Sequence, residues 1–169
     1  MLNIISIMKI IEQTSIMTTI NNIQTQFGGL LSSLQQAGVL NDKGQFTITN
    51  NPSTGITNKG GTIGFLHYWA GGSAEPSIVN FGTNVKSMIT DLQKLPGTGD
   101  LVQSLEDNTP LKTDNAQQLQ TKFSNLTNDL LSSQNDLLGG GLDTTTQEGA
   151  TGVINGKTYI FTNGNWVSQ

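Results

Sequence analysis

The chain contains no cysteine among its 169 residues. Disulfide bonds, thiolate metal sites and cysteine nucleophiles are therefore excluded. A chain without cysteine also suits a subunit that must unfold to pass through an export machine.

Charged residues make up only 12% of the chain, against about 25% in typical globular proteins. Thr, Asn, Gln, Ser and Gly take their place, a composition commoner in exported, surface and assembly proteins than in cytosolic enzymes. The formal net charge is −4 and the eight basic residues are dispersed, which argues against a nucleic-acid partner, because such a partner needs clustered Lys and Arg. We expect a secreted or surface-associated protein.

The N-terminal segment 1–12 is apolar but is interrupted by Lys9 and Glu12. It is too short to be a transmembrane span, and it lacks the basic start and the small-residue cleavage site of a signal peptide. We interpret it as the first turns of a helix, with a membrane-surface helix as the alternative. Met17 is an alternative start, because a better-patterned segment begins there.

Three segments carry apolar residues at alternating spacings of three and four. Such spacings place the side chains on one narrow seam of a helix, as in bundles and coiled coils. The first seam comprises Ile16, Ile20, Ile23, Phe27, Leu30 and Leu34; the second Ile78, Phe81, Val85, Met88, Leu92 and Leu95; the third Ala116, Leu119, Phe123, Leu126 and Leu130.

The ends of these helices are marked by capping and breaking residues. The third helix is predicted over Thr113 to Leu138 and ends at three consecutive glycines, Gly139 to Gly141. A short helix is expected between Gly99 and Pro110. The pair Gly28–Gly29 lies inside the first helix, where each glycine costs about 1 kcal/mol, so it marks either a weak point or a close approach of another backbone.

Two parts of the chain have a β pattern. The insertion 38–75 contains Gln45 to Thr49, which alternates like a strand, and the apolar stretch Thr62 to Trp69. After a polar linker from Asp143, the pairs Asn155–Gly156 and Asn163–Gly164 separate β-branched and aromatic runs, the strongest short signal for hairpins. The predicted fold is mainly α. It comprises a bundle of three to four amphipathic helices over 1–142, with a small β insertion at 38–75, and a C-terminal hairpin or meander over 143–169.

No catalytic or metal-binding constellation emerges. His67 is the only histidine, no Gly-x-Ser-x-Gly motif is present, and Lys59 to Thr62 lacks the glycine spacing of a phosphate-binding loop. Asp136 and Asp143 around the three glycines resemble calcium-binding loops only in a single imperfect copy. We predict that the protein is not an enzyme and uses no metal and no cofactor.

The aromatic residues suggest a second kind of site. The segment from Asn155 to Val167 resembles one unit of the cell-wall-binding repeats of surface proteins and toxins, although Thr158 replaces a usual aromatic and no second copy follows. The resemblance implies that aromatic faces stack on sugar or choline. The residues proposed for contact with a ligand or partner are Tyr159, Trp166, Tyr68 and Trp69.

The principal functional prediction is a structural or assembly protein that forms homo-oligomers or filaments through the seams at Ile16 to Leu34 and Ala116 to Leu130. In its composition of cysteine-free, acidic helices rich in Gln, Asn and Ser, the chain resembles type III secreted filament and translocator proteins and, more loosely, harpins. The alternative is a binding module that presents the C-terminal hairpin to a glycan or a surface protein, as a virion or phage-tail component would.

Overall fold

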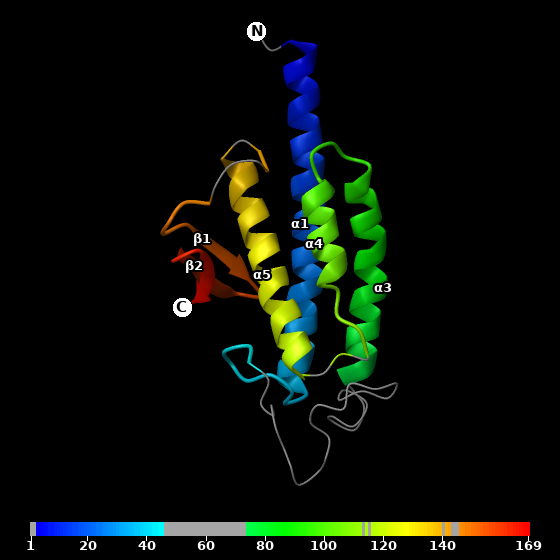
Figure 1. Cartoon of the computed structure of the whole chain (residues 1–169), viewed down its shortest axis with the longest axis vertical. Helices are drawn as coiled ribbons and strands as arrows, with labels where there is room; N and C mark the ends of the chain where they lie inside the picture. The colour runs from blue at the N-terminus through cyan, green and yellow to red at the C-terminus, as the bar shows by residue number, and fades with distance from the viewer. Residues whose placement is uncertain (1–2, 46–73, 113, 115, 140, 143–145) are drawn as a thin grey trace.

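The computed structural model describes residues 3–45, 74–112, 114, 116–139, 141–142 and 146–169. In this part of the chain the fold is a helical bundle with a three-stranded antiparallel sheet at its C-terminal end (Figure 1). The predicted mainly α fold with a C-terminal meander is thus confirmed. The predicted strand at Thr62 to Trp69, and all of Gln45 to Thr49 except Gln45, lie outside the described residues.

Helix α1 spans Ile4–Gln36 and is the longest element, about 50 Å at 1.5 Å per residue. Asn3 caps its start, where the side-chain oxygen accepts a hydrogen bond from the Ser6 backbone amide at 2.8 Å. Its end is a Schellman motif, in which Gly38 adopts φ +76° and the Val39 amide donates to the Leu34 carbonyl. Both ends of this helix are therefore set by local sequence.

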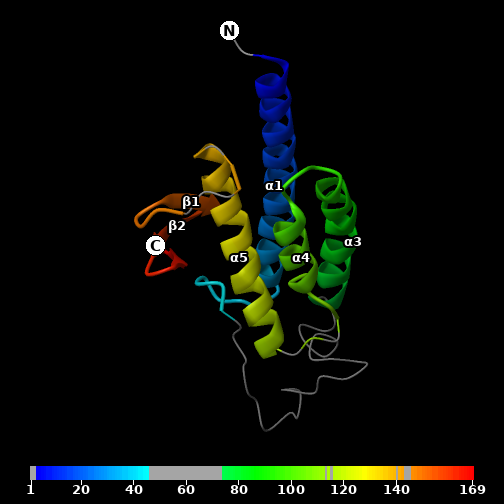
Figure 2. The same ribbon diagram turned by 45° about the horizontal axis from the view of Figure 1, so that its top comes forward.

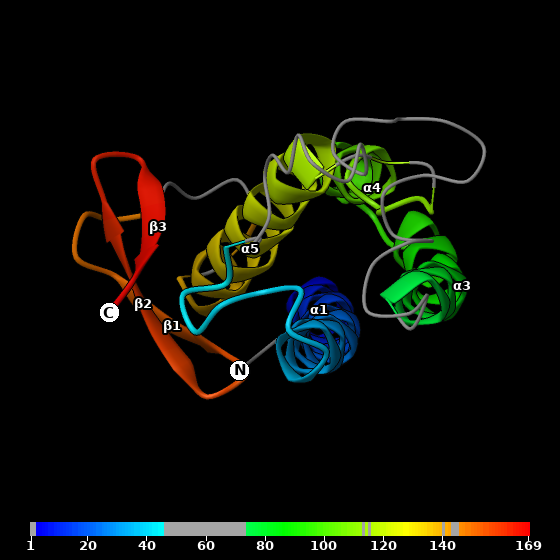
Figure 3. The same ribbon diagram turned by 90° about the horizontal axis from the view of Figure 1, so that it is seen from below.

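The remaining helices are α3 (Ala74–Gln93), α4 (Gly99–Asp107) and α5 (Ala116–Leu138). Viewed along the bundle, α5 and α3 lie on either side of α1, and α4 lies between them (Figure 3). The Phe27 ring of α1 contacts Phe81 of α3 at 6.0 Å and Phe123 of α5 at 5.7 Å between ring centroids. One aromatic residue from each predicted seam thus meets at the centre of the core.

The sheet consists of β1 (Thr151–Ile154), β2 (Lys157–Thr162) and β3 (Asn165–Ser168), in that order. Both connecting turns have two residues with positive φ, Asn155–Gly156 and Asn163–Gly164, which is the type I′ geometry that Asn-Gly favours. The sheet packs beside α5 (Figure 3). Ile154 and Trp166 point into this contact and are buried.

The pair of glycines in α1 is explained at one of its two positions. Gly28 is buried beside the first hairpin turn, where a Cβ atom would lie 3.3 Å from Asn155 Cβ. Gly29 is exposed, and a Cβ atom there would meet no described atom within 4 Å. The close approach of another backbone therefore concerns Gly28 alone.

Candidate docking site at the N-terminal end of α1

The first turns of α1 extend beyond the end of the bundle, as two views of the molecule show (Figures 1 and 2). The neighbouring elements stop lower down, at the turn that contains Pro96 and at the end of α5. The projecting segment Ile4 to Ile11 is called the apolar tip here. Its exposed large side chains are Ile4 (75%), Ile5 (78%), Ile7 (44%), Met8 (54%), Ile10 (49%) and Ile11 (58%).

Apolar residues occupy opposite sides of the tip. At about 100° of rotation per residue, Ile7 lies about 180° around α1 from Ile16, which belongs to the buried seam. Ile4 and Ile11 lie within about 60° of Ile7 by the same geometry. These three side chains therefore face away from the bundle. They would stay uncovered even if the neighbouring helices extended alongside the tip.

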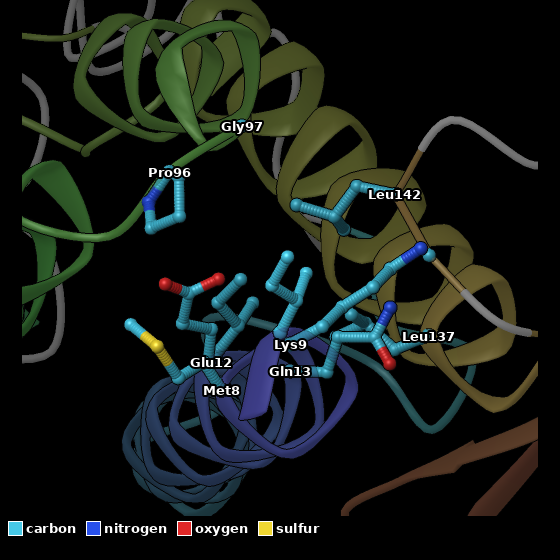
Figure 4. A pocket seen from close by; sticks show the side chains of 11 residues that line it. Met8, Lys9, Glu12, Gln13, Pro96, Gly97, Leu137 and Leu142 are labelled. Carbon is cyan, nitrogen blue, oxygen red and sulfur yellow. The ribbon is translucent and has the colours of Figure 1, made fainter. Parts of the chain in front are cut away.

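The other side of the tip borders a groove of about 670 Å³. Its floor is formed by the α3–α4 turn and the end of α5, and its wall by α1. In Figure 4 the Lys9 side chain extends toward Leu142, whereas the Glu12 carboxylate points toward Pro96. The groove is lined by Ile5, Met8, Lys9, Glu12, Gln13, Ile16, Pro96, Gly97, Leu137, Gly141 and Leu142.

Lys9 and Glu12 are the only charged residues in the 33 residues of α1, and both line the groove. The half of α1 that faces away from the bundle therefore carries no charge at all. Its exposed surface consists of Ile, Thr, Asn, Ser, Gly and Gln side chains. An uncharged helix face continuous with an apolar tip is the most distinctive surface that the described residues offer.

The predicted self-association seams are used inside the chain. The members of the first seam, Ile16 to Leu34, are buried, as are Leu119, Phe123, Leu126 and Leu130 of the third; Ala116 is the first residue of α5. They pack against one another and against Ile78, Phe81, Val85 and Leu92 of the second seam. These seams are therefore not free for a second subunit in this structure.

The aromatic residues of the meander face the bundle rather than solvent. Trp166 is only 7% exposed; its Nε1 donates to Ser132 Oγ at 2.8 Å, and its ring meets Phe161 edge-on at 5.4 Å. Tyr159 is half-buried, and burial raises its pKa. Both border a cleft of about 330 Å³ between β3, α5 and the turn at Lys43, but Trp166 does not present an open face for stacking on a sugar. Tyr68 and Trp69 lie outside the described residues.

Polar groups in the described core serve the fold. Asp114 accepts hydrogen bonds from the Leu111 amide and from Lys122 Nζ, both at 2.8 Å, which ties the start of α5 to the preceding loop. Ser104 Oγ donates to Asp129 at 2.6 Å, between α4 and α5, and burial raises the pKa of Asp129. No cluster of three or more metal-ligating side chains occurs within the described residues. His67 and Asp143 lie outside them.

The distribution of apolar residues in the sequence indicates that the tip differs from the rest of α1. A helix that packs on one side shows a single apolar stripe, whereas a helix that is apolar all round needs neighbours on every side. The tip has six large apolar side chains within Ile4 to Ile11, so its first turns follow the second pattern. The interpretation of segment 1–12 as the first turns of a helix does not indicate that those turns project beyond the bundle.

No known protein family, curated protein or solved structure matches this chain. Among the described residues, none of the helices combines the length and apolar character needed to cross a membrane.

Proposed function

We propose that the protein is a non-enzymatic assembly subunit that self-associates through the apolar tip of α1. The single observation that supports this most directly is the exposure of six large apolar side chains on one projecting segment. Contiguous exposed apolar surface on a folded protein is typical of an interaction site. The low charge and the absence of cysteine support an exported or surface-associated subunit.

The energetics suit reversible association. Complete burial of one Ile or Met side chain contributes about 1.5–3 kcal/mol, and the tip residues are about half exposed. At the lower coefficient, covering all six therefore contributes roughly 5 kcal/mol. Association costs about 4–15 kcal/mol in lost freedom, so the tip alone gives a weak complex and further contact along α1 is needed for a stable one.

The charge of the tip favours a second protein over a lipid surface. Amphipathic helices that lie on membranes carry Lys and Arg along a polar face, whereas the tip has one lysine and its nearest acidic residue is Glu12. The glycan-binding alternative has less support, because Trp166 is buried against Ser132. A second copy of the chain carries the same apolar surface, and Ile4, Ile7 and Ile11 on that surface lie on the opposite side of the helix from the groove that Lys9 lines.

The experiment is multi-angle light scattering of the purified full chain across a concentration series. We expect the mass to rise with concentration, and we expect the triple variant Ile4→Gln, Ile7→Gln, Ile11→Gln to remain monomeric, since Gln preserves helix propensity but not apolar surface. A matched control is Val153→Thr with Val167→Thr, two exposed apolar residues on the meander (53% and 48%), which should associate like the wild type. A wild-type chain that is monomeric at every concentration would contradict the proposal.

A further inference from the structure

We propose that copies of this chain associate with their α1 helices parallel, through the face of α1 that points away from the bundle. This inference rests on the proposed self-association and specifies its geometry. The face, called the outer face here, follows spacings of three and four from Ile4 to Thr18 and resumes at Thr25. It comprises Ile4, Ile7, Ile11, Thr14, Thr18 and Thr25, all of them exposed. Asn21 lies at its edge, where the side-chain oxygen accepts a hydrogen bond from Gln134 of α5 at 3.1 Å.

The outer face has the periodicity of a helix–helix interface. Alternating spacings of three and four keep side chains on one seam toward a partner helix. The seam begins in the tip and continues beside the bundle, and it spans about 31 Å at 1.5 Å per residue. Because the inner seam of the same helix is already buried in the core, the outer face can only be covered from outside the bundle.

The hydroxyl groups on this face already have partners. Thr14, Thr18 and Thr25 each donate to the backbone carbonyl four residues earlier, at 2.8, 2.9 and 3.0 Å. A buried donor that lacks a partner is costly, but these donors would enter an interface satisfied. The threonines can therefore be covered by an apolar neighbour without losing a hydrogen bond.

The occupant that this surface fits is another copy of itself. The outer face has no charged residue, because Lys9 and Glu12 line the groove on the opposite half of the helix. A charged partner could form no ion pair with this face, whereas two outer faces meet without electrostatic repulsion. The contact is then isologous, with the same residues supplied by both copies.

The distribution of apolar residues along the face sets the direction. Ile4, Ile7 and Ile11 lie at one end and Thr18 and Thr25 at the other. Parallel helices in register place isoleucine against isoleucine and threonine against threonine. Antiparallel helices that overlap over the whole face place isoleucine against threonine, which leaves apolar side chains beside polar ones.

Cysteine crosslinking tests the geometry without background, because the chain has no cysteine of its own. Ile7→Cys reports on the tip and Thr18→Cys on the part of α1 beside the bundle. Both should form covalent dimers under mild oxidation, since a disulfide requires Cα atoms within about 7 Å. The matched control is Thr90→Cys on α3, an exposed threonine whose hydroxyl also donates to the carbonyl four residues earlier; it should crosslink only at the level of random collision.

The outcomes separate this inference from the proposed function. Efficient crosslinking at both Ile7→Cys and Thr18→Cys supports parallel outer faces. Oligomers that crosslink at neither position, or at only one of them as in an antiparallel pair, overturn the parallel geometry while self-association stands. A chain that is monomeric by light scattering overturns both.

Discussion

Gly28 and Gly29 are neighbours in the middle of α1 but have different surroundings. Gly29→Ala should raise the free energy of unfolding by about 1 kcal/mol, because alanine costs less backbone entropy in a helix and the added methyl group meets no described atom within 4 Å. Gly28→Ala should gain less or lose stability, because its methyl group would press against Asn155 at 3.3 Å. Urea unfolding of the two variants provides the comparison, and equal gains would show that the hairpin turn does not pack on Gly28 as described.

Asp129 on α5 is partly buried and accepts a hydrogen bond from Ser104 of α4. Burial raises its pKa above the ordinary value of 3.8, and the hydrogen bond from Ser104 opposes this shift to a smaller extent. The folded chain therefore holds this proton more tightly than the unfolded chain, so stability falls as pH rises through the raised pKa. Asp129→Asn should raise the thermal midpoint at pH 7, and the difference from the wild type should shrink as pH approaches 3.8. The control is Asp100→Asn, an exposed carboxylate on α4; a difference that persists unchanged at low pH would exclude desolvation as the cause.

Gly152 determines how closely the meander approaches α5. A Cβ atom at this position would lie 2.6 Å from Leu131 Cδ2, and Leu131 is itself buried. Gly152→Ala should therefore cost about 1–3 kcal/mol through overpacking. In a Leu131→Ala background the same substitution should cost much less, so a double-mutant cycle in urea should show strong coupling. Additive effects would mean that the penalty arises from the backbone of β1 rather than from this contact.

The elements that the sequence predicted well are those specified by neighbouring residues. The Asn-Gly turns determine their own hairpins through positive φ, and the three seams predict helices because their period is local. The side of the meander that faces the bundle is not a local property. One face carries Tyr159, Phe161 and Trp166, whereas the other carries Val153, Ile160 and Val167, as the strand register shows. Both faces are apolar, so only packing on α5 decides that Trp166 is buried.

The three seams show that a pattern of three and four spacings does not reveal whether the partner helix belongs to the same chain or to another one. Spacings of three and four show that one side of a helix will be covered, but an intrachain and an interchain neighbour leave the same pattern. Three seams on one chain can satisfy one another, and in this structure they do. Large apolar side chains remain exposed on the tip, Ile4 to Ile11, which is also where the outer face of α1 begins.

Self-association through this surface should couple to stability. A partner that binds only the folded chain stabilises it by mass action, so the unfolding midpoint of an oligomer depends on protein concentration. Since 1 kcal/mol shifts the midpoint by about 2–4 °C for a chain of this size, the wild type should gain a few degrees per tenfold rise in concentration. Ile7→Gln should abolish that dependence with little change in the midpoint at high dilution, because Ile7 lies on the tip and outside the core.

The control for this measurement is Val79→Gln, which replaces an exposed apolar residue on α3 (43%) and should retain the concentration dependence. Differential scanning calorimetry with reversible transitions provides the midpoints. If Ile7→Gln lowers the midpoint equally at every concentration, the tip stabilises the single chain rather than a contact between chains. The first turns of α1 would then contribute to the stability of the single chain through contacts within that chain, and the apolar tip would have a role in folding rather than in assembly.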